Sequence, residues 1–429
     1  RRQRQMCIRD RQEEREETLF TRAERGLVWC ASMKKASSTD EAAELLVNGF
    51  CVILFPKTGK ALACEVKTGE KRSPSAPEAE NTVKGAKDAF TETLRTNTSL
   101  IRRHLRTPEL RLEESVVGRR SLTKVTVCWV EGLTDPELPA RMKKRLGEID
   151  IDGLLSPAAV EEYVTGARKT AFPLLEFTER TDHFCQGLLD GQVGLLVDGL
   201  PIGYLAPVSF GRLMRSPEDR ATDYLSASML RILRYLALGV SLLLPGIYAA
   251  MAMFHQQMLP TKLLLSIVES KQDVPFSTLF EVVGLLCAFE LLQQAGLHLP
   301  QAIGTAVSII GGLVVGTAAV DAKLVSPAAL IVTASSGICG FTLPNRELSD
   351  ALRLWRLGLT VLGGVFGLFG VTAGVLLLLV MLAGLESLGR SYLAPFGEAE
   401  VKGALVRERL TEQKWRDGTL RPLDERNQR

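Results

Sequence analysis

The stretch SLLLPGIYAAMAMFHQQMLPT (Ser241–Thr261) decides the architecture of this chain. It begins with apolar residues, carries Pro245 near its start and ends with the polar run His255–Gln257. A helix rises about 1.5 Å per residue, so roughly 20 apolar residues cross a hydrocarbon layer about 30 Å thick. The stretch is therefore predicted to be a membrane-spanning helix. We expect Pro245 to kink it and the polar run to lie at the far interface.

The quoted stretch belongs to one of four uncharged runs in the second half of the chain, at 235–261, 291–320, 324–345 and 357–385. Four such runs would be very improbable in a soluble protein of 429 residues. The overall averages, 46% hydrophobic and 24% charged residues, hide this division because charges are dense before Arg234. We therefore predict an all-α transmembrane domain over 229–396 with four to six spans, preceded by a large water-soluble part.

The soluble part is predicted to have a mixed α/β (α+β) fold with two subdomains, at 12–120 and 121–228. A weak internal echo supports this division, because Leu45–Leu62 and Leu188–Leu205 share a Leu-Leu pair, a glycine, a β-rich run and a turn. In the second copy Asp198-Gly199 predicts a β-hairpin with a type I′ turn, which requires positive φ at both central residues.

Three local patterns lie between the two copies. Leu122–Val130 alternates with a period of two, as a strand does. Asp135–Ile149 and Ser156–Val164 are predicted helices, the second with Ser156 as N-cap and Pro157 at the first helical position.

Three segments are expected to lie outside the folded core. The first eleven residues lack the apolar region of a signal peptide and resemble translated sequencing-adapter sequence, so we exclude them from the fold. Lys71–Asn81 is rich in Pro, Ser and Glu and is predicted to be a linker or exposed loop. Residues 397–429 form a charged C-terminal tail.

The join between the two parts begins with a capping-box pattern, in which Ser216 caps, Pro217 follows and Asp219 falls at the third helical position. Arg231 and Arg234 lie three residues apart on one helical face, directly before the first apolar run. Because positively charged residues flanking a span favour the cytoplasm, they predict that the soluble part is cytoplasmic.

Small residues recur at helical spacing inside the membrane part. They permit close approach of helix backbones, where lipid offers no hydrophobic drive to associate. We expect these faces to pack against protein, in this subunit or a neighbour. The candidate helix-packing residues are Gly304, Ser308, Gly312 and Gly316, with Gly363 and Gly367, and the pattern repeats at Gly370 and Gly374.

Pro275–Pro300 is interrupted by Glu281 and Glu290, and a carboxylate facing lipid is costly. The segment is either an interfacial or re-entrant helix, or one that lines a pore or cavity. If it spans, Arg346, Arg353 and Arg356 fall on the cytoplasmic side, as charge bias prefers. Nine residues correspond to about 900° of helix rotation, so the two carboxylates point in opposite directions. We assign Glu281 to the permeation path and Glu290 to a contact between helices or subunits.

Catalytic and metal-binding motifs are missing from the sequence. It contains no GxSxG, HExxH or complete phosphate loop, and the eight cysteines form no CxxC pair. The four histidines lack metal-ligand spacing, and a net charge of +3 does not indicate nucleic-acid binding. We predict a protein that is not an enzyme and has no cofactor and no metal.

Seven blocks of sequence, in order along residues 45–397, carry a family resemblance. They resemble the A subunit of GerA-class spore germinant receptors. The blocks are FTETLRTNTSLIRRHL (Phe90–Leu105), RLGEIDIDGLLSPAAVEEYV (Arg145–Val164), FTERTDHF (Phe177–Phe184), LLDGQVGLLVDGLPIGYLAP (Leu188–Pro207), LPGIYAAMAMFHQQMLPTKLLLSI (Leu244–Ile267), VPFSTLFEVVGLLCAFELLQQAGLHLPQAIGTAVSIIGGLVVGTAAVDAKLVSPA (Val274–Ala328) and SYLAPFG (Ser391–Gly397).

The resemblance implies a multi-pass protein of the spore inner membrane. Its expected partners are a permease-like B subunit, a lipoprotein C subunit, membrane lipid and further copies of itself, around an ion-conducting pore that opens when nutrient is sensed. The chain departs from the family pattern at Ala86 and Thr181, where Pro is usual, and at Gln293, Gln294 and His298, where Arg, Glu and Arg are usual.

Three functional classes follow: a gated ion-channel or receptor subunit, which we favour, a secondary transporter, and a scaffold that does not conduct. A transporter would favour inverted repeats, which the sequence does not display. The pore or gating candidates are Glu281, Glu290, Pro245, His255, Gln293 and His298.

Overall fold

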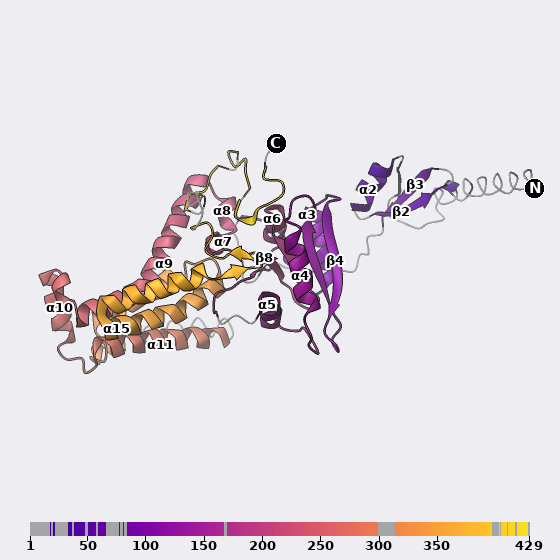
Figure 1. Ribbon diagram of the computed structural model, residues 1–429. Helices are drawn as coiled ribbons and strands as arrows, with labels where there is room; N and C mark the ends of the chain where they lie inside the picture. The colour runs from indigo at the N-terminus through magenta and orange to yellow at the C-terminus, as the bar shows by residue number, and fades with distance from the viewer. Residues whose placement is uncertain are drawn as a thin grey trace, which may run out of the picture. The chain divides into compact units, whose positions relative to one another are not determined.

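Figure 1 shows the computed structural model, which describes residues 84–166, 170–298 and 314–396 together with parts of 18–80 and 403–427. The chain forms two compact units. The front unit consists of 1–167, 177–207 and 415–429, and the helical unit consists of 168–176 and 208–414. The predicted order of a mixed α/β part and then an all-α part is confirmed.

A small sheet lies near the start of the front unit. Helix α2 (Thr39–Val47) lies between β1 (Met33–Ala36) and β2 (Phe50–Phe55), and β3 (Lys60–Glu65) completes the antiparallel order β1-β3-β2. Phe55 pairs with Lys60 at the end of the β2–β3 hairpin. The first copy of the sequence echo therefore lies on a hairpin, as predicted.

A five-stranded sheet forms the centre of the front unit, in the order β4-β5-β7-β8-β6. Its strands are β4 (Leu110–Val117), β5 (Thr123–Val130), β6 (Glu176–Thr178), β7 (Val193–Val197) and β8 (Gly203–Ala206). The helices of this region are α3 (Leu94–His104), α4 (Glu137–Gly147), α5 (Pro157–Thr165) and α6 (Thr181–Leu189). The boundary expected at 120/121 falls inside the β4–β5 hairpin, whose two strands pair along their full length.

Apolar side chains from the sheet and from α3 and α6 form the core of this region. The Phe90 and Phe184 rings meet edge to face, with centroids 5.3 Å apart. A Cβ added to Gly203 would lie 2.6 Å from the Phe184 ring, so glycine is required there for the ring to lie on β8. The glycines of the second echo copy therefore serve packing as well as turning.

Most local predictions in this region are confirmed. The strand predicted at Leu122–Val130 is β5, and the two predicted helices are α4 and α5. The Ser156 hydroxyl accepts a hydrogen bond from the Ala159 amide at 3.3 Å, as an N-cap does.

The second hairpin forms as predicted, but its turn type was predicted incorrectly. Leu196 pairs with Gly203, which leaves a loop longer than two residues, and of the predicted turn pair only Gly199 has positive φ (88°). The Asp198 carboxylate instead accepts a hydrogen bond from the Leu94 amide at 3.0 Å, at the start of α3. The loop is shaped by this distant partner rather than by local hairpin geometry.

Long helices dominate the helical unit. They are α9 (Tyr224–Met253), α10 (Thr261–Lys271), α11 (Thr278–His298), α14 (Pro327–Gly340) and α15 (Arg346–Ala383). Shorter elements are α7 (Phe210–Leu213), α8 (Glu218–Ala221), η2 (Gln256–Met258), η3 (Val314–Ala318), α13 (Ala319–Asp321), β9 (Glu386–Ser387) and β10 (Arg390–Ser391), while η4 (Gly418–Leu420) lies in the front unit.

Among the described residues, α9, α11 and α15 are long and apolar enough to cross a membrane, and α14 is apolar but shorter. The predicted span count also depends on 299–313, which lies outside the described residues. Gly304, Ser308 and Gly312 lie in that segment too. Gly316, in η3, is half-buried, and a Cβ added to it would lie 3.9 Å from the Leu330 side chain.

Helix α15 is a helical hairpin, and its reversal lies inside the uncharged run 357–385. Gly367 has φ 66° and ψ −152° inside it, so residues 346–366 and 368–383 are separate helical segments. A Cβ added to Gly363 would lie 2.9 Å from the Val371 side chain, and one added to Gly370 would overlap the Leu362 carbonyl. In a continuous helix residues eight apart are about 12 Å apart along the axis, so the chain reverses at Gly367.

Contacts along the bundle establish the direction of each helix. Gly246 and Gly363 approach closely, as do His255 and Gly367, so α9 runs parallel to the first segment of α15. Leu279 of α11 lies against Gly364 and Glu290 pairs with Arg353, so α11 runs opposite to the first segment of α15. Helix α11 therefore runs opposite to α9. This places Arg353 and Arg356 at the end where α9 begins, the arrangement expected if Pro275–Pro300 spans.

Candidate functional site

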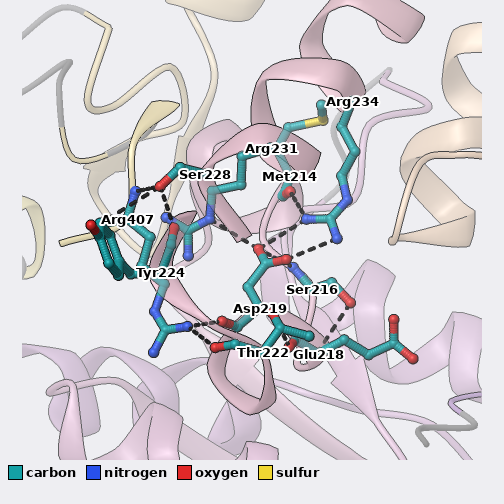
Figure 2. A network of polar contacts seen from close by, with 10 residues as sticks. All are labelled: Met214, Ser216, Glu218, Asp219, Thr222, Tyr224, Ser228, Arg231, Arg234 and Arg407. Atoms are coloured by element: carbon teal, nitrogen blue, oxygen red, sulfur yellow. Dashed lines mark hydrogen bonds and ion pairs between the residues drawn. The ribbon is translucent and has the colours of Figure 1, made fainter. Parts of the chain in front are cut away.

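A buried polar cluster lies where the chain enters α9, and Figure 2 shows its members. We call it the junction cluster: Asp219, Arg231, Arg234 and Arg407, with Ser216, Thr222 and Ser228. Asp219 is 1% exposed, and its carboxylate accepts hydrogen bonds from Arg231 Nε at 2.9 Å and Arg234 Nη1 at 2.9 Å. The two arginines predicted from charge bias are therefore held by an internal carboxylate.

The predicted capping box forms only in part at α8, whose N-cap is Pro217 rather than Ser216 and has no side-chain cap bond. The Ser216 amide donates to the Asp219 carboxylate at 3.2 Å, and the Glu218 amide donates to the Ser216 hydroxyl at 3.4 Å. However, α8 ends at Ala221, and α9 has its own N-cap in Asp223, which accepts from the Leu225 amide at 3.3 Å. The sequence analysis missed this second cap, although Asp before a helical run is a usual signal.

Arg407 brings the C-terminal tail into the junction cluster (Figure 2). It is 9% exposed, and its guanidinium donates to the Thr222 carbonyl at 2.7 Å and to the Asp219 carbonyl. Its amide also donates to the Ser228 hydroxyl at 3.0 Å. Sequence reasoning treated this part only as a charged tail, because nothing local distinguishes Arg407 from the arginines around it.

The charge balance of the junction cluster favours an ionised Asp219. Burial alone would raise the pKa of Asp219, but hydrogen bonds and charge from Arg234 and Arg231 outweigh burial and hold this pKa below its usual value. One carboxylate thus neutralises part of a site that contains three arginines. The cluster ties α8, the start of α9 and the tail together.

Glu281 lies at the opposite end of the bundle. It is 2% exposed, accepts a hydrogen bond from the Ser326 amide, and lies 3.5 Å from the Lys271 ammonium. Ser326 is the N-cap of α14, so the carboxylate faces the positive end of that helix dipole. These contacts hold Glu281 between α10, α11 and α14.

Glu290 lies two and a half turns further along α11 and contacts α15. Its carboxylate is 3.0 Å from Arg353 Nη1 and 4.0 Å from Arg356 Nη2. Gln293 lies one turn beyond and lines a cavity with the same two arginines. The structure therefore brings Glu290 and Gln293 together, and separates both from Glu281.

The remaining candidates occupy different places. Pro245 is buried inside α9, and the helix continues through it. His255 lies just past the end of α9, where a Cβ added to Gly367 would be 2.8 Å from its ring. His298 is the last residue of α11, and its side chain is outside the described part of the structure. The six residues do not form one site.

The chain thus joins a mixed α/β unit to a bundle of apolar helices, and known proteins with similar sequences share this order. A family model described as Bacillus/Clostridium GerA spore germination protein matches residues 3–419. The chain belongs to the GerA family. The match covers both units, so the resemblance seen in the sequence blocks is confirmed.

Individual relatives agree with this membership. The GerA-family chain is 35% identical over 405 residues to the membrane protein YfkQ of Bacillus subtilis (strain 168), covering 94% of this chain and 78% of the relative. It is 36% identical over 378 residues to spore germination protein KA of the same organism, covering 87% and 70%.

A solved structure is also similar in sequence. It is the crystal structure of the N-terminal domain of the A subunit of the Bacillus megaterium spore germinant receptor GerK3, at 30% identity and a TM-score of 0.32. The similarity covers 42% of the GerA-family chain and 64% of the solved one, slightly under two thirds.

Proposed function

We propose that this chain is the A subunit of a nutrient germinant receptor in the spore inner membrane, where it works with a permease-like B subunit and a lipoprotein C subunit. The observation that carries the proposal is the family match over residues 3–419, which includes the soluble and the helical units. Relatives that cover most of the chain bear the name spore germination protein. Nutrient sensing would then be passed from the B subunit to this chain.

We further propose that several copies assemble into a ligand-gated ion channel. Polar groups inside the helical unit support this, because ionisable residues within apolar helices usually mark pathways for ions or charged groups. Glu281, Glu290 and Arg356 are such residues. Gly239, Gly284 and Gly337 leave open positions on three apolar helices, where a helix of another copy can approach closely.

Planar-bilayer recording of the purified chain tests the channel proposal. Steady single-channel currents are the expected result, whereas uptake of a solute coupled to an ion would indicate a secondary transporter. An electrically silent bilayer that contains correctly folded chain would indicate a scaffold for the permease-like partner. Orientation in the bilayer can be checked in the same sample by protease protection.

The permeation role assigned to Glu281 stays a prediction. Substitution of Glu281 distinguishes a role in ion permeation from a role in holding the helices together. If Glu281 lines the path, Glu281→Gln should lower cation conductance while assembly is unchanged, because a carboxylate ring favours cations. Glu290→Gln is the matched control on the same helix, and it should weaken the contact to Arg353 rather than conduction. Equal conductance and selectivity of wild type and Glu281→Gln, at matched protein levels, would refute the role.

The orientation of the chain in the membrane is a separate prediction. The position of its arginines supports a front unit on the cytoplasmic side. Arg231, Arg234, Arg353 and Arg356 all lie at the end of the bundle where α9 begins. Ser121 is exposed in the front unit, so a cysteine placed there reports its side of the membrane. We expect Ser121→Cys to react with an impermeant maleimide in inside-out vesicles but not in right-side-out ones.

Peptide mass mapping distinguishes the introduced thiol from the natural ones, of which Cys51 and Cys287 are exposed among the described residues. Permeabilised vesicles serve as the positive control. Efficient labelling of the Ser121→Cys peptide in intact right-side-out vesicles would reverse the proposed topology.

A further inference from the structure

A polar cavity lies between four helices of the bundle, at the end where α9 begins. It is lined from α9, α11, α14 and α15, and its polar lining residues are Ser241, Gln293, Ser349, Arg353 and Arg356. Two of these are arginines and none is a carboxylate. The lining is therefore suited to a negatively charged group.

Arg356 is less closely neutralised than its neighbour Arg353. It is 8% exposed, and its nearest carboxylate, Glu290, is 4.0 Å away, beyond hydrogen-bond distance. Its Nη1 is 3.5 Å from the Ser336 hydroxyl, and its Nε has no hydrogen-bond partner among the described residues. A buried charge without a close counterion is costly, most of all between apolar helices.

Arg353 differs from Arg356 in this respect. Its guanidinium lies 3.0 Å from Glu290 and 3.1 Å from Asp350, so its charge is balanced within the chain. Gln293 adds a second unused group to the cavity, because its side-chain oxygen is buried without a partner among the described residues. The atoms without a partner at the cavity are thus Arg356 Nε and the Gln293 side-chain oxygen, and only the first of these is a donor.

Glycines keep the cavity open beside Arg356. A Cβ added to Gly340 would lie 3.1 Å from the Ser241 hydroxyl and 4.0 Å from Arg356 Nη1, so a side chain there would narrow the approach to the guanidinium. Gly337 lines the same wall and has nothing within 4 Å of an added Cβ. Neither glycine adds a side chain to this wall of the cavity, where Ser336 is the α14 residue that contacts Arg356.

The surroundings indicate which anion fits. The planar guanidinium presents several N–H donors and matches the oxygens of a phosphate group. Phe341 lines the cavity and is 64% exposed, and Ile338 beside it is also exposed on α14. An apolar margin next to a basic pocket between membrane helices suits a phospholipid, with its phosphate in the pocket and its acyl chains outside.

We propose that this cavity binds the phosphate group of an anionic phospholipid, with Arg356 as its principal ligand. The headgroup supplies a closer counterion than Glu290, which lies 4.0 Å from Arg356 Nη2. Lipid binding at this site requires that the chain lies in a membrane, and it does not require the germinant that the receptor senses.

Native mass spectrometry of the full chain in detergent, titrated with dioleoyl-phosphatidylglycerol, tests the proposal. Arg356→Gln should weaken lipid binding about tenfold, because one charge-assisted hydrogen bond contributes roughly 1.5–3 kcal/mol. Gln293→Arg adds a second cation to the cavity and should tighten binding. Gln294→Arg adds the same charge at an exposed neighbouring position and should change binding little.

Titrations with other phosphate compounds identify whether the bound phosphate belongs to a lipid. Titration with phosphatidylcholine, whose choline cation neutralises the same phosphodiester, should give weaker binding that still depends on residue 356, and sodium phosphate should not displace the lipid at equal concentration. The proposal is overturned if Arg356→Gln binds phosphatidylglycerol as wild type does, or if Gln293→Arg and Gln294→Arg have the same effect. Displacement by inorganic phosphate would overturn the assignment to lipid. If Arg356→Gln does not fold, the comparison of Gln293→Arg with Gln294→Arg still tests whether the lipid binds at the cavity.

Discussion

Asp219→Asn is expected to destabilise the helical unit by about 3–5 kcal/mol, the usual effect of removing one partner from a buried ion pair. The carboxylate binds Arg231 and Arg234, and all three side chains are buried or nearly so. Without it, two guanidinium groups stay in the junction cluster with Arg407, and no other carboxylate in the described part of the chain pairs with them. The same substitution also weakens the capping box of α8, because Asp219 accepts from the Ser216 amide.

Thermal unfolding of the detergent-solubilised chain measures this effect, with Trp355 of α15 as a fluorescent probe inside the helical unit. Glu218→Gln is the matched control, because it neutralises the adjacent carboxylate, which is exposed. We expect the control to change stability by less than about 0.5 kcal/mol. Similar melting of Asp219→Asn and Glu218→Gln would show that the junction cluster does not stabilise the unit.

The pKa of Asp219 adds a pH dependence of known sign. Its pKa in the folded chain lies below the usual value, which is about 3.9 in an unfolded chain. The stabilisation is therefore fully present above about pH 4 and is lost as the pH falls through the folded-state pKa. Wild type and Asp219→Asn should differ most at neutral pH and become more alike under acid conditions.

The features that sequence analysis predicted correctly depend on neighbours in the chain. Ser156 caps α5 because its hydroxyl reaches an amide three residues on. The period-two pattern that predicted β5 is also local, although most residues on both faces of that strand are buried. The helix rotation between Glu281 and Glu290 also predicted that their carboxylates point in opposite directions, and the two carboxylates do contact different helices. Helical geometry alone is enough for such inferences.

The features that were missed depend on residues far apart in the sequence. Asp198 binds an amide 104 residues away, and this contact overrides the preferred hairpin turn. Arg407 binds Thr222, 185 residues earlier, and no local pattern marks it. The reversal at Gly367 was hidden because glycines three or four residues apart fit both a continuous packing face and two segments folded against each other.

Gly363→Ala is expected to separate two helices that now touch through their backbones. A Cβ at residue 363 would lie 2.5 Å from the Gly246 carbonyl oxygen of α9, and backbone cannot move aside as a flexible side chain can. Overpacking of this kind costs about 1–3 kcal/mol, and Gly363→Leu should cost more. The change would also push against Val371, on the other segment of the α15 hairpin.

Gly358→Ala provides a matched control in the same helix, because a Cβ at residue 358 meets nothing within 4 Å. It should be neutral or stabilise the chain by up to about 1 kcal/mol, since alanine favours helix over glycine. Gly246→Ala should resemble Gly363→Ala, because its added Cβ would lie 2.9 Å from the Leu359 carbonyl across the same contact. The double variant should then cost less than the sum of the singles, because residues in contact are not additive and one separation of the helices relieves both clashes. Equal thermal stability of Gly363→Ala and Gly358→Ala would contradict the close backbone contact between α9 and α15.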